Sequence, residues 1–227
     1  MPISTSDIKD IRALQQKKFR KERGMFVVEG VKTVEALIQS NLEIIGIYTT
    51  EKLDFLNEVD DSLVHFIKQN ELERISGLKS PNRVLAVAKN PEPKQIDWNK
   101  NLILILDGIN DPGNVGTIIR TAKWFGVETI ICSPECADAY DGKVVQSTMG
   151  ALFHVNLRYE DLSIMMDECR SNDFRIIGAA MNGESVYDCS NSTKTALVVG
   201  SESHGISKAV LDKCDHLVTI PNNETSQ

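Results

Sequence analysis

One apolar run constrains the fold of this chain more than any other feature. Residues 102–107 read Leu-Ile-Leu-Ile-Leu-Asp, and an uninterrupted apolar run of this kind is typical of a strand covered on both faces. Strand-like and helix-like patterns alternate after it, which predicts right-handed crossovers and a mostly parallel sheet. The patterns predict helices at about 115–125, 142–152, 161–170 and 206–213, and strands at 128–132, 153–157, 174–180, 195–200 and 216–220.

A second, smaller alternation occupies the first part of the chain. Apolar residues recur at helical spacing from residue 4 to about residue 18, with Ser6 as the expected N-cap. Two prolines among polar residues then indicate a linker around residues 90–95. The remaining patterns predict helices at 31–39 and 71–75, strands at 25–29, 43–48 and 63–67, and a turn followed by a strand within 80–88. The sequence therefore predicts an α/β protein with a domain at 1–89, a linker at 90–101 and a domain at 102–227.

Composition narrows the class of protein. Of the 227 residues, 41% are hydrophobic and 25% are charged, which excludes an intrinsically disordered chain. No apolar run approaches the ~20 residues of a membrane span, and the first residues lack the apolar core of a signal peptide. Five scattered cysteines, an odd number, favour a reducing compartment over a disulfide framework. We therefore expect a soluble cytoplasmic protein.

The net charge of −7 argues at first against a nucleic-acid partner, because phosphate binding depends on Lys and Arg. The charge is unevenly distributed, however. Residues 1–30 carry seven lysines and arginines against four acidic residues. This basic stretch could be a solvated helix face or a surface that binds phosphates, and charge alone does not separate the two interpretations.

A glycine-rich loop follows the apolar run. The pattern predicts a tight turn into a helix, with Asn114 as its N-cap and Arg120 about two turns inside. It matches neither Gly-x-Gly-x-x-Gly nor Gly-x-x-x-x-Gly-Lys-Ser/Thr, so it is not one of the familiar nucleotide fingerprints. Spacing alone leaves two interpretations open: a capped helix with an exposed arginine, or a functional pair.

Two further loops follow predicted strands. Gly200-Ser-Glu-Ser-His-Gly205 opens after a buried strand, so backbone amides there could approach a ligand closely. Glu202 in this loop is either a carboxylate that holds a ligand or a cap that stabilises the loop. The last strand stops at Ile220-Pro221. Ligands bind at the carboxyl ends of strands in parallel sheets, which directs attention to these loops and to the one after Ala180.

Each of these motifs is weak evidence by itself, but together they resemble a known protein family. Asn114 with Arg120, the loop at 200–205 and Ile220-Pro221, in this order, closely resemble the three motifs of the SpoU/TrmH family of RNA 2′-O-ribose methyltransferases, in the SPOUT class. The resemblance covers roughly residues 100–221. It implies S-adenosylmethionine as methyl donor, a C-terminal domain with trefoil-knot topology, and a homodimer.

The N-terminal part adds to the resemblance. Residues 6–88, with Phe26-Val-Val-Glu-Gly-Val-Lys32 and Ser80-Pro-Asn-Arg-Val-Leu-Ala-Val87, resemble the small α/β substrate-binding domain that often precedes this methyltransferase domain. The expected partner is structured RNA, with rRNA favoured over tRNA. The candidate RNA-binding residues are Lys17, Lys18, Arg20, Lys21, Arg23 and Arg83.

The resemblance also implies roles for individual residues. Arg120 would lie at the target ribose and stabilise the developing alkoxide, because a guanidinium stays protonated at neutral pH and makes a poor base. Asn114 would position Arg120 or the substrate, and Glu202 would brace its loop. The implied cofactor-binding residues are Met181, Gly200, Gly205, Ile220 and Pro221. The mechanism requires no metal.

Other interpretations of the sequence remain. Family members continue after Ile-Pro with a Ser-Leu-Asn-Val-like segment and a helix, so we expect the domain that ends at Gln227 to be incomplete. The alternative is a catalytically inactive RNA-binding paralogue. A Rossmann-type oxidoreductase fits the alternation but lacks its glycine fingerprint. Cys132 and Cys136 have three residues between them rather than two, which argues against a zinc site, and Trp124 is expected in core or dimer packing.

Overall fold

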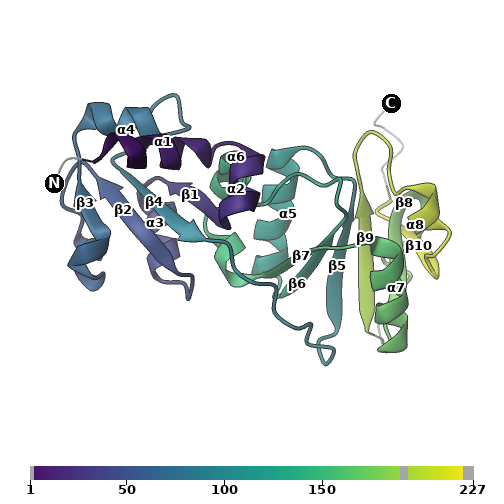
Figure 1. The fold of residues 1–227 in the computed structure, drawn as a ribbon. Coiled ribbons are helices and arrows are strands. Elements are labelled where there is room, and N and C mark those ends of the chain that lie inside the picture. The colour runs from purple at the N-terminus through teal and green to yellow at the C-terminus, as the bar shows by residue number, and fades with distance from the viewer. Residues whose placement is uncertain (1–2, 190–193, 222–227) are drawn as a thin grey trace. The chain divides into compact units, whose positions relative to one another are not determined.

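The computed structural model describes residues 3–189 and 194–221 (Figure 1). Within these residues the strands form a four-stranded sheet in the order β1-β4-β2-β3 and a six-stranded sheet in the order β10-β8-β9-β5-β6-β7. The chain divides into two compact units. The first contains residues 1–92, 116–120 and 138–154, and the second contains residues 93–115, 121–137 and 155–227.

The four-stranded sheet of the first unit is mixed. β4 pairs antiparallel with β1 and β2, and β3 pairs parallel with β2. The elements are α1 (Thr5–Ala13), α2 (Lys17–Arg23), β1 (Met25–Glu29), α3 (Val31–Ile38), β2 (Ile44–Thr49), two short 3-10 helices (Asp54–Glu58 and Asp61–Leu63), β3 (Val64–Phe66), α4 (Gln69–Ile75) and β4 (Val84–Lys89).

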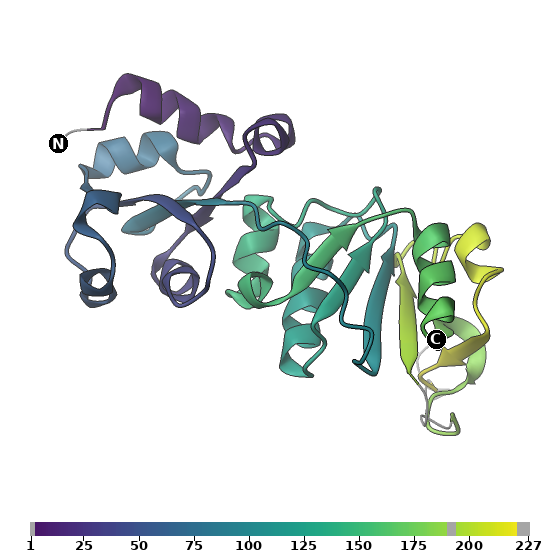
Figure 2. The same ribbon diagram turned by 60° about the horizontal axis from the view of Figure 1, so that its bottom comes forward.

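Helices cover both faces of this sheet (Figure 2). Ile8 and Ile11 of α1 and Leu72 of α4 pack with Val27 and Leu85 in one buried cluster. Side chains alternate between the two faces of a strand, so the neighbouring strand residues point toward the other face, where Val34 and Leu37 of α3 are fully buried.

The N-terminal helix differs from its prediction in two ways. It begins after Ser4 rather than Ser6, because the Ser4 side chain accepts the N–H of Asp7 at 3.0 Å. It also ends at Ala13, and the basic stretch forms a separate helix, α2. That helix stops at Gly24, whose φ of 62° is left-handed and favours glycine.

A segment from the second half of the sequence belongs to the first unit. It includes α6 (Gly142–Thr148) and a 3-10 turn (Ala151–His154). The ring of Phe26 in β1 lies 5.0 Å from that of Tyr140 and 6.4 Å from that of Phe153, centroid to centroid. Residues 138–154 therefore fall within the sequence-based domain at 102–227 yet pack on the N-terminal sheet.

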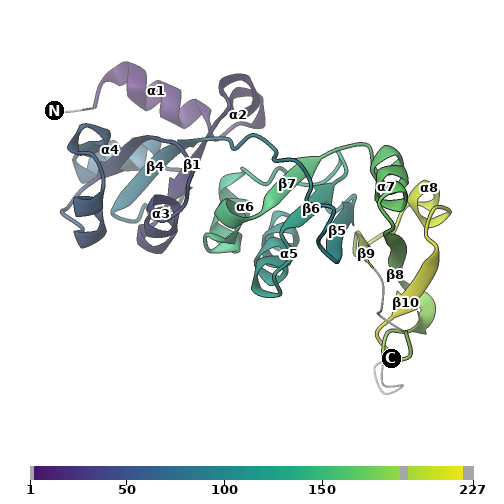
Figure 3. The same ribbon diagram turned by 90° about the horizontal axis from the view of Figure 1, so that it is seen from below.

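All pairings in the six-stranded sheet are parallel, which confirms the α/β prediction. In Figure 3, α7 and α5 lie on opposite sides of its central strands. The elements are β5 (Leu102–Asp107), α5 (Pro112–Trp124), β6 (Thr129–Cys132), β7 (Asn156–Tyr159), α7 (Leu162–Ser171), β8 (Arg175–Ser185), β9 (Thr195–Gly200), α8 (Lys208–Leu211) and β10 (His216–Thr219).

Several boundaries differ from the sequence patterns. The helix predicted at 142–152 ends at Thr148, because Met149 adopts a left-handed conformation with φ 50°. The following strand accordingly starts later than predicted, at Asn156. The helix predicted at 206–213 is reduced to Lys208–Leu211.

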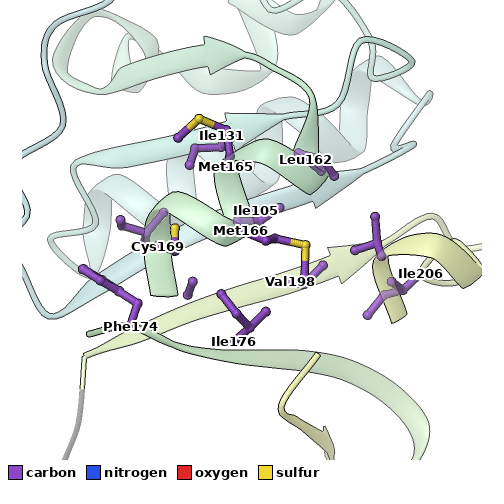
Figure 4. Close-up of a cluster of buried hydrophobic side chains, with 13 residues drawn as sticks. Ile105, Ile131, Leu162, Met165, Met166, Cys169, Phe174, Ile176, Val198 and Ile206 are labelled. Carbon is purple, nitrogen blue, oxygen red and sulfur yellow. The ribbon is translucent and has the colours of Figure 1, made fainter. Parts of the chain in front are cut away.

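The core of the second unit lies between the sheet and α7 (Figure 4). Met165, Met166 and Cys169 of α7 pack on strand residues that include Ile105 and Val198. This layer makes the central strands rigid, so the loops at their carboxyl ends start from fixed positions.

Among residues 3–189 and 194–221, no helix is long and apolar enough to cross a membrane. The same part of the chain contains no group of three or more His, Cys, Asp or Glu side chains placed to hold a metal ion.

Candidate functional site

The carboxyl ends of β5 and β9 lie side by side. The parallel register pairs Leu106 with Val199 and Asp107 with Gly200. β8 pairs with the other side of β9, with Ala179 opposite Val199. The glycine loop after β5 and the loop after β9 therefore start from adjacent positions at one edge of the sheet, where ligands bind in parallel α/β proteins.

The helix after β5 begins earlier than the sequence predicts. Asp111, not Asn114, is the N-cap of α5: its carboxylate accepts the N–H of Asn114 at 2.8 Å, and Pro112 occupies the first turn. Proline suits this position because its missing N–H would have no partner in the first turn. The prediction of Asn114 as the cap was wrong, and Asn114 instead lies half-buried inside the first turn.

Arg120 lies on the exposed surface of α5. Its side chain makes no hydrogen bond or ion pair with any residue in the described part of the chain, so its guanidinium is available to a ligand. Arg120 is six positions beyond Asn114 in the helix, which corresponds to about 9 Å along the axis. Asn114 is thus too far along the helix to orient Arg120 by a direct hydrogen bond.

The loop after β9 is a small hairpin closed by backbone hydrogen bonds. The N–H of Ser201 donates to the carbonyl of Gly205 at 3.0 Å, and the N–H of Gly205 donates to the carbonyl of Ser201 at 2.8 Å. Gly205 has φ 68°, and a Cβ on Gly200 would collide with the backbone of Gly205 and Ile206. Gly205 must be glycine because of its positive φ, and Gly200 must be glycine because a side chain there has no space.

Glu202 lies at the exposed end of this hairpin, which we call the 201–205 hairpin. Its side chain has no hydrogen-bond or ion-pair partner among residues 3–189 and 194–221. The family resemblance implies that Glu202 braces its loop, and the structure does not show this contact. The backbone bonds between Ser201 and Gly205 close the hairpin instead.

The other predicted cofactor contacts are open to solvent. Met181 is 98% exposed and Ile220 is 75% exposed, and Pro221 is also exposed. Met181 lies in a bulge of β8. Leu217 of β10 pairs with Gly178, but the next residue, Val218, pairs with Glu184, so the β8 residues between these two are left out of the pairing with β10. The residues 222–227 that follow Pro221 lie outside the described residues.

Two side chains from the turn after β6 support the start of the β5 loop. Ser133 Oγ accepts the N–H of Gly108 at 3.1 Å, and Cys136 Sγ accepts the N–H of Ile109 at 3.3 Å. A hydrogen bond from the Cys132 thiol lowers the pKa of Cys136 to about 6, and the same bond, followed by burial, raises the pKa of Cys132 well above its usual value. Ser133 and Cys136 therefore serve as supports of the loop, and Cys132 acts on the loop only through its bond to Cys136.

The candidate RNA-binding residues have different environments. Lys17, Lys18 and Lys21 are exposed on α2. Arg20, on the same helix, is only 3% exposed and pairs with Asp138 at 2.8 Å.

The remaining two arginines of the set form exposed ion pairs. Arg23 pairs with Asp10 at 2.8 Å, and Arg83 pairs with Glu51 at 2.7 Å. Of the six basic residues, only Arg20 is withdrawn from the surface, so the structure assigns it an internal contact rather than the predicted surface contact with RNA.

No sequence motif indicated Asp107 as a functional residue. This carboxylate ends the apolar strand β5, is 8% exposed, and accepts the N–H of Ser207 at 2.6 Å. The sequence did contain one indication of its role: Asp107 is the single acidic residue at the end of an apolar run. A carboxylate buried at such a position needs a hydrogen-bond partner. Its partner could not be identified from local sequence.

Comparisons with known protein families agree with this geometry. Residues 101–227 match the SpoU rRNA Methylase family, and residues 5–86 match the MRM3-like substrate binding domain. The first match covers the six-stranded sheet, and the second covers the four-stranded sheet except for the end of β4.

Individual relatives are also similar over much of the chain. The 23S rRNA (guanosine(2553)-2′-O)-methyltransferase RlmP of Bacillus subtilis is 28% identical over 94% of this chain and 86% of its own length. A putative TrmH family tRNA/rRNA methyltransferase of Staphylococcus epidermidis is 38% identical over 52% of the chain, which spans about half (49%) of that relative.

Solved structures show the same fold. A putative RNA methyltransferase of the TrmH family from Porphyromonas gingivalis superposes with a TM-score of 0.88 at 32% identity, covering 99% of this chain and 91% of that one. The SpoU methyltransferase AviRb from Streptomyces viridochromogenes, in complex with AdoMet, gives a TM-score of 0.86 at 24% identity, covering 99% of this chain and 91% of that one.

Proposed function

The chain belongs to the SpoU rRNA methylase family, and on this premise we propose that it transfers a methyl group from S-adenosylmethionine to a ribose 2′-hydroxyl in structured RNA. The single observation that carries the proposal is the family match over residues 101–227, which includes the adjoining loops after β5 and β9. The 28% identical relative named as an rRNA 2′-O-methyltransferase supports rRNA over tRNA as the substrate.

The loops at the strand ends fit an adenosyl group. The space that a Cβ on Gly108 or Gly205 would occupy is open, and both residues have positive φ. Backbone groups there can approach a flat ligand without an intervening side chain. When bound, S-adenosylmethionine supplies an electrophilic methyl group on a sulfonium. Gly200 and Gly205 are the residues that we propose to hold it.

Arg120 is the residue that we propose to act on the RNA. A ribose hydroxyl is a weak nucleophile at neutral pH, and its oxygen gains negative charge as the methyl group is transferred. An exposed guanidinium without a protein partner can orient the hydroxyl and stabilise that charge. Asn114, half-buried in the first turn of the same helix, would contact the substrate rather than Arg120.

The first unit supplies the proposed RNA-binding surface. Lys17, Lys18 and Lys21 present three ammonium groups on one exposed helix. Arg83 adds a fourth cation, although Glu51 partly neutralises it. The match of residues 5–86 to a substrate-binding domain supports this assignment.

We also propose a cytoplasmic homodimer, with the trefoil-knot topology that the sequence resemblance implies. Trp124 and Phe125, at the end of α5, are 85% and 75% exposed, and an adjacent pair of exposed aromatic residues favours packing against a second copy. Replacing both with serine should convert the dimer to a monomer in light scattering.

Methyl transfer to RNA tests the central proposal. The protein is incubated with tritiated S-adenosylmethionine and unmodified rRNA or tRNA, and the label is sought in alkali-resistant dinucleotides. A 2′-O-methyl group removes the nucleophile for alkaline cleavage, so such dinucleotides report ribose methylation. We expect label in rRNA. Cofactor binding without transfer to any RNA would instead support the inactive RNA-binding alternative.

A further inference from the structure

Asp107 is a buried carboxylate that the proposed mechanism does not use. It follows five apolar residues in β5 and is 8% exposed. An ionised carboxylate loses solvation when it is buried, so it needs hydrogen-bond donors in exchange. Its contacts therefore indicate what it does in the fold.

The donor comes from the far end of the neighbouring loop. Asp107 Oδ2 accepts the backbone N–H of Ser207 at 2.6 Å, across 100 residues of sequence. Ser207 is the N-cap residue that directly precedes α8, and it follows the 201–205 hairpin and Ile206. A short hydrogen bond between an ionised acceptor and a backbone N–H is among the stronger hydrogen bonds in proteins.

This bond completes the attachment of the hairpin. On its first side the hairpin continues from β9, where Gly200 lies opposite Asp107 in the register. On its second side Ile206 is 9% exposed and its side chain enters the core cluster beneath α7 (Figure 4). Asp107 then holds the next residue. Both ends of the hairpin are thus tied to the end of β5.

The bonds inside the hairpin cannot replace this attachment. The pair between Ser201 and Gly205, and the bond from the His204 N–H to Ser201 Oγ at 3.2 Å, determine the shape of the hairpin. They do not determine its direction relative to the sheet. Glu202 is exposed, and its side chain forms no hydrogen bond or ion pair with another described residue.

We propose that Asp107 is a positioning residue, which orients the 201–205 hairpin for cofactor binding through its hydrogen bond to the Ser207 N–H. The inference rests on the proposed function, because the ligand is the adenosyl group assigned to Gly200 and Gly205. Asp107 does not contact the reacting atoms. It keeps the backbone of the hairpin beside the end of β5, where the cofactor would bind.

Variants at both ends of the bond separate positioning from other roles. Asp107→Ala removes the acceptor, whereas Asp107→Asn keeps an acceptor oxygen. Ser207→Pro removes the donor N–H, and the φ of −61° at Ser207 suits proline. Ser207→Ala keeps the N–H and is the reference for the proline variant. Asp161→Ala is the matched control, because Asp161 also accepts backbone N–H groups at a helix start, that of α7.

Two measurements test the inference. Calorimetry gives the Kd for S-adenosylmethionine, and hydrogen exchange gives the protection of amides 201–207. We expect Asp107→Ala and Ser207→Pro to weaken binding about tenfold or more and to speed exchange in this segment, relative to wild type and Ser207→Ala. Asp107→Asn should recover most of the affinity, and Asp161→Ala should bind like wild type.

The outcomes distinguish this inference from the proposed function. If wild type binds the cofactor and Asp107→Ala binds it equally well with unchanged exchange, the positioning role is wrong and the function stands. If wild type does not bind the cofactor, the proposed function is wrong and so is the role of Asp107 in cofactor binding. Exchange then decides only whether Asp107 orients the hairpin: faster exchange confined to 201–207 in Asp107→Ala would uphold that, and unchanged exchange would reject it.

Discussion

Arg20 lies in the middle of a basic run, yet its side chain points into the first unit. Its guanidinium donates to Asp138 at 3.0 and 2.8 Å and to Asp141 at 3.2 Å, and also to the carbonyls of Leu14 and Gln15. All of these acceptors lie in the first unit. Arg20 thus fastens α2 to the segment that leads into α6, which is a structural role rather than an RNA contact.

Replacing Arg20 tests this role. Arg20→Met leaves Asp138, whose side chain is 15% exposed, without a cation, and we expect a loss of about 3–5 kcal/mol in urea unfolding. Arg23→Met is the control on the same helix. Its partner Asp10 is half exposed, so the loss should stay below about 1 kcal/mol. Equal, small losses in both variants would show that Arg20 is not a buried clamp.

The prediction for Arg120 is the opposite one: its replacement should reduce methyl transfer but not the stability of the fold. Arg120→Ala should slow methyl transfer by about 100-fold or more, because it removes a charge that acts on the transition state. Cofactor affinity and thermal stability should change little, since Arg120 has no partner among the described residues. Lys123→Ala, an exposed cation one turn later, is the control. A parallel loss of cofactor affinity would make Arg120 structural.

Cys136 provides a spectroscopic prediction. Its pKa is lowered to about 6, mainly by the hydrogen bond from Cys132, whereas desolvation raises the pKa values of Cys169 and Cys214 to about 11. Thiolates absorb near 240 nm, so a pH titration of the native protein should show a thiolate step near pH 6, to which Cys169 and Cys214 do not contribute. Cys136→Ser should remove this step. Persistence of that step would assign it to another group.

At the scale of elements, the start of α5 shows how a local rule can select the wrong residue. Asn and Asp are both good N-caps, and the glycine loop offers Asn110, Asp111 and Asn114 within five positions. Pro112 decides the matter, because proline is favoured in the first turn and the cap must then precede it. The same signal was present in the sequence.

The cap assignment can be measured. Asp111→Ala should lower the free energy of unfolding by about 1 kcal/mol, because the N–H of Asn114 loses its acceptor. Asn114→Ala should cost less in stability, since its side chain makes no cap bond, while reducing methyl transfer if it contacts the substrate. The reverse order of stabilities would restore Asn114 as the cap.

At the scale of the whole molecule, charge is distributed unevenly. The chain carries a net charge of −7, yet α2 exposes three lysines. An acidic average is therefore compatible with an RNA partner, provided that the cations gather where the phosphates bind.

Salt dependence tests this distribution. Each phosphate contact to a single strand contributes about 0.7 to the slope of log affinity against log salt. Replacing Lys17, Lys18 and Lys21 together with serine should therefore reduce that slope by about 2. The control replaces Lys52, Lys68 and Lys94, which are equally exposed, and changes the net charge by the same amount. Equal slopes in the two triple variants would contradict a specific basic surface on α2.

Much of the fold followed from local patterns. The strands at 25–29, 102–107 and 195–200 have the predicted bounds, because each is a short apolar run between clear turn signals. The predicted helix ends were less accurate. α6 ends at Thr148 because the next residue, Met149, adopts a positive φ, which is uncommon for a residue other than glycine and was not predicted from the sequence. The family assignment, which rests on short ordered motifs, is confirmed.

The sequence by itself determined the α/β class, the parallel second sheet and the loops that follow its strands, because apolar periodicity and glycine spacing act over a few residues. Only the tertiary structure decided that Arg20 is buried and that Asp107 holds the 201–205 hairpin. Their partners lie 118 and 100 residues away. Such contacts depend on which strands and helices become neighbours, and local sequence does not specify those neighbours.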